Sequence, residues 1–236
     1  MTETRRLYYE DVYKKEFTAT VVECRERKKG YEVILDESAF YPEGGGQPSD
    51  VGILGDAKVT EVHEKDGELL HYTDKALEVG AKVEGKIDWA HRFDLMQQHS
   101  GEHMVSGIIH AKYGYDNVGF HMGSDVITVD LNGMLDEAQL AEIEQEVNER
   151  VWEDKEVQIT YPTAEELKTL DYRSKKELTG QVRIVTFPGV DVCACCGTHV
   201  THTGEIGMVK LLSVVKFRDG IRMEMICGKR VLDYLN

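Results

Sequence analysis

The chain has 236 residues, of which 41% are hydrophobic, and it carries a formal net charge of −15 at pH 7. This length and composition can form one large domain or two small ones with a buried core. The acidic charge excludes broad coating of nucleic acid or of an anionic membrane, although it leaves room for a local basic patch.

Two features of the sequence bear on the cellular compartment. No apolar run approaches the length of a membrane span, and the first residues contain no signal-peptide core, so we expect a soluble cytoplasmic protein. The five cysteines include three within four positions, Cys193, Cys195 and Cys196. This odd, clustered set does not match a disulfide framework and favours a metal site or reduced thiols.

Residues 1–87 alternate short β-rich segments with turns that contain Gly or Asp. The segments rich in Val, Thr, Ile and Tyr are 17–26, 31–36, 58–63, 68–72 and 82–87. Short strands with this spacing predict a small antiparallel β-barrel as a first domain.

One stretch of this first domain, residues 40–52, is unusual because it contains three successive glycines, Gly44, Gly45 and Gly46, followed by Gln47. Glycine permits backbone conformations closed to other residues and lets a ligand approach the main chain closely. A flexible hairpin loop is the plainer alternative. The flanking aromatic residues, the Gln and the Asp make the composition more specific than a flexible loop needs.

The pattern changes at Asp88, which can cap a helix over residues 89–113 that ends at Gly114. A β segment (126–131), a second helix (136–152) with a capping box, a strand (158–161) and a short helix (164–170) follow. Residues 182–226 are mostly strand and loop. The second domain, residues 88–236, is therefore predicted to be α+β.

Four residues far apart in the chain predict one metal site. His99 and His103 are four apart on the first helix, so both imidazoles lie on one face. Cys195 and His199 are also four apart, and together the four side chains suit tetrahedral Zn²⁺. Either pair alone is a weak signal. Cys193 and Cys196 compete with Cys195 for the sulfur position, and His202 is a further competing ligand.

The first pair can also be interpreted as the H-x-x-E-H pattern of inverted zinc peptidases, with Glu102 as general base. This motif is short and arises often by chance. It needs a third ligand and leaves Cys195 and His199 without a purpose, so a metallopeptidase ranks second.

Three segments in this order carry a family resemblance: Phe-Tyr-Pro-Glu-Gly-Gly-Gly-Gln at 40–47, His-x3-His at 99–103 and Cys-x-Gly-Thr-His at 195–199. The chain resembles the freestanding alanyl-tRNA editing proteins of the AlaX group, medium-length type. These are similar to the editing domain of alanyl-tRNA synthetase and, more distantly, of threonyl-tRNA synthetase. Cys196 departs from the pattern, where the family usually has glycine, and Cys193 is a second departure.

The resemblance implies zinc ligands at His99, His103, Cys195 and His199. It places Thr128 beside the aminoacyl group and the glycines at 44–46 near the same pocket. We expect Thr128, Gln98 and Glu102 to orient water or the leaving hydroxyl. The residues expected to contact substrate are Gly44, Gly45, Gly46, Gln47 and Arg222.

The implied reaction is hydrolysis of the ester between serine, or also glycine, and the terminal ribose of tRNA(Ala). Four protein ligands would fill a tetrahedral zinc site and favour an organising role for the metal. Basic residues concentrate between Lys210 and Arg230 and could meet phosphates, although an ordinary solvated surface explains them equally well. A zinc-stabilised RNA-binding module without catalysis is the third interpretation.

Overall fold

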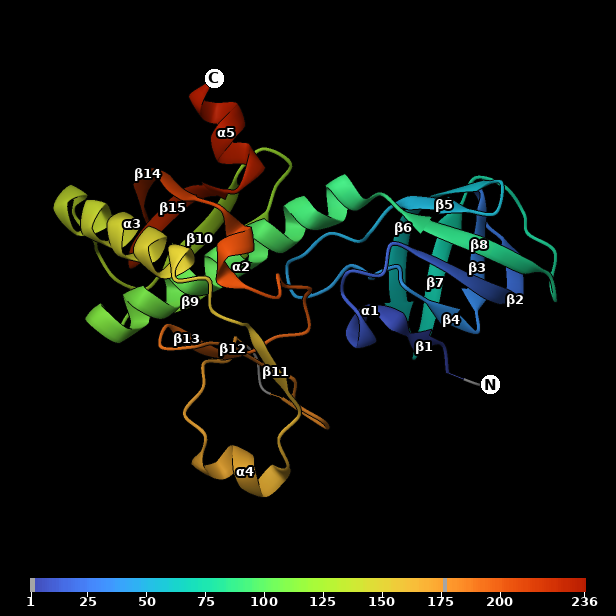
Figure 1. Ribbon diagram of the computed structural model, residues 1–236, viewed down its shortest axis with the longest axis horizontal. Helices are drawn as coiled ribbons and strands as arrows, with labels where there is room; N and C mark the ends of the chain where they lie inside the picture. Colours follow the sequence, from blue (N-terminus) through green and yellow to red (C-terminus); the bar gives the residue numbers. More distant parts are fainter. Residues whose placement is uncertain (1–2, 176–177) are drawn as a thin grey trace. The chain divides into compact units, whose positions relative to one another are not determined.

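The computed structural model describes residues 3–175 and 178–236 of the chain (Figure 1). The chain forms two compact units, Met1–Leu95 and Met96–Asn236. The boundary between them falls within the long helix α2, Trp89–Tyr113. The division at residues 87 and 88 that the sequence suggests stays a proposal.

The first unit is a closed barrel of six antiparallel strands in the order β2-β3-β7-β6-β5-β8. Its strands are β2 (Glu16–Glu26), β3 (Tyr31–Leu35), β5 (Gly52–Leu54), β6 (Ala57–Lys65), β7 (Glu68–Thr73) and β8 (Lys82–Ile87). The short elements β1 (Arg5–Arg6), α1 (Leu7–Glu10) and β4 (Glu37–Ser38) accompany it. The predicted barrel is confirmed. Only β5 was missed, because three residues are too few to show an alternating pattern.

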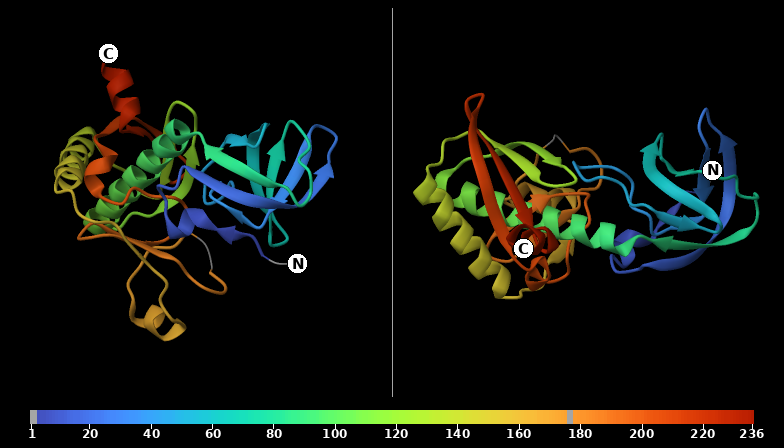
Figure 2. Two further views of the ribbon diagram at one scale, coloured as in Figure 1. Left: turned by 45° about the vertical axis from the view of Figure 1, so that its right-hand side comes forward. Right: turned by 90° about the horizontal axis from the view of Figure 1, so that it is seen from above.

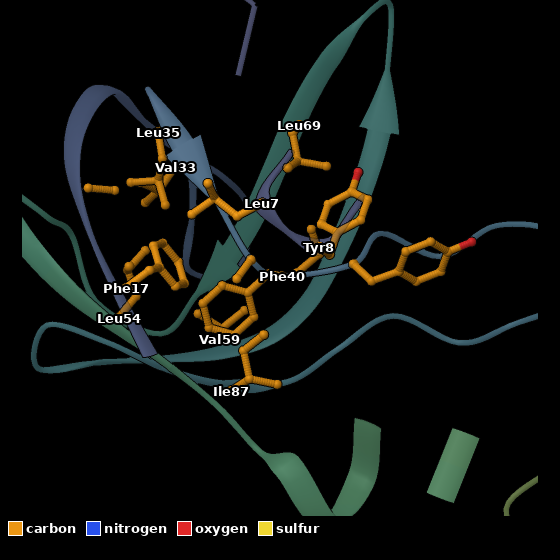
Figure 3. Close-up of a cluster of buried hydrophobic side chains, with 14 of the residues drawn as sticks. Leu7, Tyr8, Phe17, Val33, Leu35, Phe40, Leu54, Val59, Leu69 and Ile87 are labelled. Atoms are coloured by element: carbon orange, nitrogen blue, oxygen red, sulfur yellow. The ribbon is translucent and has the colours of Figure 1, made fainter. Parts of the chain in front are cut away.

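The barrel is filled by the apolar side chains that point inward from alternate strand positions (Figure 3). Val33, Phe40, Leu54 and Val59 are completely buried. Phe17 needs the space beside Gly85, since a Cβ there would lie 2.4 Å from its ring. The interior of the barrel is therefore a packed core.

The glycine-rich loop forms a well-defined, hydrogen-bonded turn. Gly44 and Gln47 exchange both main-chain hydrogen bonds, at 3.1 and 3.0 Å. Gly45 and Gly46 between them have φ angles of +62° and +81°, the combination that a type I′ turn requires and that glycine adopts without strain. The Tyr41 hydroxyl donates to the Gly44 carbonyl at 3.2 Å, which fixes the turn from its side.

A buried ion pair holds the end of this loop. Asp50 accepts a hydrogen bond from the Tyr41 amide at 2.7 Å and faces the guanidinium of Arg92, and both charged side chains are completely buried. Arg92 also donates to the carbonyls of Val12 and Ala39, at 3.0 and 2.7 Å. All of these groups belong to the first unit, so they fix the loop on the barrel.

The second unit has two sheets. One has the strand order β14-β15-β10-β9 and the other β11-β12-β13. The strands are β9 (Asn117–Met122), β10 (Ile127–Leu131), β11 (Gln158–Thr160), β12 (Ile184–Phe187), β13 (Asp191–Ala194), β14 (Val209–Phe217) and β15 (Gly220–Cys227). Figures 1 and 2 show α2 and α3 (Glu137–Trp152) beside the four-stranded sheet, and α4 (Ala164–Thr169) on an excursion between β11 and β12. A 3₁₀ turn (Thr203–Ile206) and α5 (Lys229–Leu235) complete the unit.

The predicted α+β class is confirmed, and several elements begin and end where the sequence indicates. Helix α2 spans the predicted range, and Gly114 follows it with a φ of +70°. Helix α3 carries the predicted capping box between Asp136 and Gln139. Among the residues that the structure describes, no helix is long and apolar enough to cross a bilayer.

Candidate metal centre

Between the two histidines of α2, Gly101 allows the helix to pack closely against the end of β15. A Cβ on Gly101 would lie 2.2 Å from the sulfur of Cys227, at the end of β15. The Gln98 amide donates to the Cys227 carbonyl and accepts from its N–H, both at 2.8 Å. The helix is thereby fixed on the sheet with His99 and His103 facing the loop after β13.

The structure brings the four predicted ligands together. The ligand atoms of His99, His103, Cys195 and His199 all lie within 4.8 Å of one another. The Cys195 sulfur is 3.5 Å from Nε2 of His99 and 3.4 Å from Nε2 of His199. The three imidazoles are almost completely buried. These atoms converge on one point and form a site that can hold a metal ion.

Two of the imidazoles are oriented through their second nitrogen. Nδ1 of His199 lies 3.1 Å from the Ser100 hydroxyl, which also accepts a hydrogen bond from the Val200 amide. Nδ1 of His103 lies 3.1 Å from the carboxylate of Asp191. Such contacts fix the tautomer that leaves Nε2 free for a metal. One histidine therefore has a neutral partner and the other a charged one.

Asp191 is itself held in place. Arg173 donates to both of its oxygens, at 2.7 and 2.9 Å, in a bidentate pair. A Cβ on Gly107 would lie 2.6 Å from that of Asp191, so the helix glycine permits the approach. Asp191, Cys193 and His103 form a second set of three potential ligands. Because both Asp191 oxygens already accept from Arg173, we regard Asp191 as support for His103.

The surroundings favour a thiolate at Cys195 and a neutral imidazole at His199. Burial on its own would raise the pKa of the Cys195 thiol, but the charges of His99, His103 and His199 lower it well below its ordinary value. Burial and the neighbouring His99 lower the pKa of His199 to about 3. A thiolate and a neutral imidazole are the forms in which these side chains bind metals. Burial on its own would lower the pKa of His103, but the Cys195 thiolate and the Asp191 carboxylate outweigh burial and raise it well above its ordinary value.

The competing ligands lie outside the four-residue cluster. Cys196 is exposed, and Cys193 is buried and groups instead with His103 and Asp191. The His202 ring lies 3.8 Å from the Glu205 carboxylate, at the residue that precedes the 3₁₀ turn. The sulfur in the cluster is that of Cys195.

Glu102 is completely buried beside the two histidines and has a hydrogen-bond or charge partner on each oxygen. One oxygen accepts from Ser106 at 2.5 Å and Asn117 at 2.6 Å, and the other lies 3.3 Å from the ammonium of Lys175. Burial would raise its pKa, but Lys175 and the other nearby cations outweigh burial and lower it. A carboxylate with a lowered pKa is a poor proton acceptor, which argues against a general base of the peptidase kind.

Thr128 and Arg222 lie on the other face of the four-stranded sheet. Phe120 is paired with Val129 and stacks on His99, with ring centroids 5.5 Å apart. Thr128 is the next residue on β10, so its side chain points to the opposite face. Arg222 is paired with Asp130, again on that face, and donates to its carboxylate at 2.7 and 2.8 Å. The structure does not bring either residue to the cluster.

The remaining predicted site residues have separate surroundings. Both polar atoms of the Gln98 side chain are bonded to Cys227. Gly44, Gly45, Gly46 and Gln47 form the turn of the first unit. Their role toward substrate stays a prediction.

Several residues of the site were missed from the sequence. Asp191 stands two residues before Cys193 and four before Cys195, which places it on the same side of an extended segment, and that spacing was a usable signal. Phe120 and Asn117 on β9 and Arg173 and Lys175 in an irregular segment gave none, since only the fold brings them to α2.

Two family models match parts of the chain. The family model of the class II (A) tRNA synthetases matches residues 2–91, and that of the threonyl and alanyl tRNA synthetase second additional domain matches residues 182–222. Over 98% of its length the chain is 35% identical to alanyl-tRNA editing protein AlaX-L of Pyrococcus horikoshii, and over 95% it is 32% identical to alanyl-tRNA editing protein Aarsd1 of Mus musculus.

The chain is similar to the alanyl-tRNA editing proteins over nearly all of its own length. It spans 60% of the length of the Pyrococcus protein and 59% of the mouse protein. It is also 36% identical to alanine–tRNA ligase of Methanobrevibacter smithii, of which it covers 28%. The resemblance that the three sequence segments indicated is thus confirmed over nearly the whole chain.

Proposed function

We propose that the chain is a trans-editing hydrolase that deacylates mischarged tRNA(Ala) at a zinc site. The observation that carries this proposal is the convergence of His99, His103, Cys195 and His199 in a relative of the alanyl-tRNA editing proteins. The substrates would be seryl-tRNA(Ala) and, second, glycyl-tRNA(Ala). A cytoplasmic location follows from this role in translation.

The donor set fits zinc. With Zn–S of about 2.3 Å and Zn–N of about 2.0–2.1 Å, a tetrahedral ion needs sulfur and nitrogen ligands roughly 3.5 Å apart. The measured separations of the Cys195 sulfur from the two Nε2 atoms are 3.5 and 3.4 Å. The second nitrogens of His103 and His199 are bonded to Asp191 and Ser100, as in established metal centres.

The reaction is ester hydrolysis. Water adds to the ester carbonyl, the bond between the carbonyl carbon and the ribose oxygen breaks, and that oxygen takes a proton. When bound, zinc supplies Lewis-acid stabilisation of negative charge on the carbonyl oxygen, or holds the amino acid. The chain orients the imidazoles through Asp191 and Ser100, and the rings of Phe120 and Phe187 flank the histidines and exclude bulk water.

The test is release of free amino acid from seryl-, glycyl- and alanyl-tRNA(Ala), with and without a chelator. We expect hydrolysis of the first two, sparing of alanyl-tRNA(Ala), and loss of activity with the chelator. Cys195→Ala should remove both zinc and activity, whereas the matched control Cys196→Ala, at the exposed neighbour, should retain both. Zinc bound without deacylation would support a non-catalytic RNA-binding module instead, and peptide cleavage would support the metallopeptidase.

A further inference from the structure

A lysine ammonium group lies close to the metal ligands. Nζ of Lys175 is 4.4 Å from the centre of the Phe120 ring and 3.3 Å from the Glu102 carboxylate. The Phe120 ring in turn stacks on His99, with an angle of 26° between the rings. A primary ammonium is thus separated from a metal ligand by one aromatic ring.

Carboxylate and aromatic ring together are a recognition site for an ammonium ion. The carboxylate supplies a charge-assisted hydrogen bond, and the ring face attracts a cation. Ser106 and Asn117 donate to the other oxygen of Glu102 and fix its orientation. The oxygen that faces Lys175 is the one left for a cation.

The two partners differ in how they are held. The Glu102 side chain is completely buried, whereas that of Lys175 is 30% exposed and reaches in from the surface. Lys175 and Asn117 also line a cavity of about 840 Å³, which gives the lysine stem room to withdraw. A buried carboxylate without a cation is costly, so Lys175 can leave at little cost only if another cation replaces it.

We propose that Glu102 and Phe120 form a subsite for the α-ammonium of the aminoacyl group, which the Lys175 ammonium fills when no substrate is bound. The exchange replaces one primary ammonium by another, so the carboxylate stays paired throughout. This inference rests on the proposed function for the identity of its ligand, an amino acid esterified to the 3′ end of tRNA.

Binding of two non-hydrolysable analogues tests the subsite without relying on activity. One is adenosine amide-linked at its 3′ position to serine, and the other carries glyceric acid, in which a hydroxyl replaces the α-ammonium. Isothermal titration calorimetry on the zinc-loaded protein should show the seryl analogue binding about 10- to 100-fold more tightly, the scale of a hydrogen bond to a charged group.

Two variants localise the effect. Glu102→Gln keeps the shape and removes the charge, so the seryl preference should fall to nearly none while binding of the glyceryl analogue is unchanged. Lys175→Ala removes the competing cation and should tighten the seryl analogue only. The matched control is Lys168→Ala, at an exposed lysine of α4 that pairs with Glu165, and it should change neither affinity.

Equal affinity of wild-type protein for the two analogues would overturn the subsite, and so would an unchanged preference in Glu102→Gln. Either result leaves the proposed function standing if the protein deacylates seryl-tRNA(Ala). The converse result, a seryl preference in a protein that deacylates no tRNA, would overturn the proposed function and retain the subsite.

Discussion

Two buried carboxylates, one in each unit, are paired with cations in different ways. Asp50 in the barrel faces Arg92, and both side chains are completely buried, with the guanidinium also bonded to main-chain carbonyls. Glu102 beside the metal ligands faces Lys175, whose side chain remains 30% exposed. The guanidinium of Arg92 is held in place by its fork of donors, whereas Lys175 offers a point charge on a flexible stem.

The difference separates an ion pair that maintains a loop from one that can open. Displacing Arg92 would leave Asp50 and two main-chain carbonyls without their donor. Its removal should therefore lower the stability of the first unit. Lys175 can be withdrawn toward solvent, and its removal lets water or another cation reach Glu102.

The largest effect is expected for Arg92→Met. This change leaves Asp50 buried without its cation and should lower the free energy of unfolding of the first unit by about 3–5 kcal/mol. Urea unfolding followed by Trp89 fluorescence in a Trp152→Phe background measures it, because Trp89 is then the single tryptophan and lies in the first unit. The matched change Lys175→Met should lower the stability of the second unit by less, because Ser106 and Asn117 still donate to Glu102 and solvent can reach the vacated place. Trp152 fluorescence in a Trp89→Phe background follows that unit. Equal losses would remove the distinction.

The second change tests the charged support of a metal ligand. Asp191→Asn keeps an acceptor for His103 but removes the charge that Arg173 holds in place. We expect a 10- to 100-fold loss of zinc affinity, the usual cost of a lost partner behind a histidine ligand. Competition with a chromophoric chelator measures the affinity. Asp116→Asn, at an exposed carboxylate that pairs with His110, serves as control. If Asp191→Asn lowered only the melting temperature, Asp191 would have a purely structural role.

The third prediction concerns pH and the interior of the barrel. His71 is completely buried between Ser38 and the Val33 carbonyl, and burial lowers its pKa from 6.5 to about 4. The neutral form is therefore favoured on folding, so its contribution is complete above pH 6.5 and is lost as the pH falls toward 4. Between pH 7 and pH 5 the first unit should lose about 2 kcal/mol. In His71→Gln, the same Trp89-monitored urea titration should show a smaller dependence on pH.

The smallest effect is expected for Thr128→Val. Its side chain lies on the face of the sheet opposite Phe120, so the ratio of seryl- to alanyl-tRNA(Ala) deacylation should stay within about twofold of wild type, far from the 1–3 kcal/mol of a lost buried hydrogen bond. Deacylation rates of both substrates give the ratio. A large narrowing would return Thr128 to the discriminating site and place the substrate on that face.

The sequence predicts the parts of this protein that depend on neighbours along the chain. Runs of β-branched residues located five of the barrel strands, and the capping box of Asp136 located α3. The four-residue offsets in each pair located the four residues of the candidate metal site. The alternation of side chains along a strand places Thr128 and Val129 on opposite faces of the sheet. Which of the two faces lies against His99 depends on where α2 packs, and the local sequence does not encode that. Arg173 and Lys175 reach α2 across about seventy residues, and no local pattern encodes such contacts.

The wide separation of the two ligand pairs has a consequence for chain entropy. A metal joining His103 to Cys195 closes a loop of roughly ninety residues, and closing such a loop in the unfolded chain costs about 4 kcal/mol. In the folded second unit that cost is already met, because α2 and β13 are neighbours through the Asp191–His103 contact. Zinc would therefore act as a cross-link between an early helix and a late strand. The second unit should unfold at a temperature that rises with free zinc, while the barrel, which contributes none of the four ligands, should be indifferent to it.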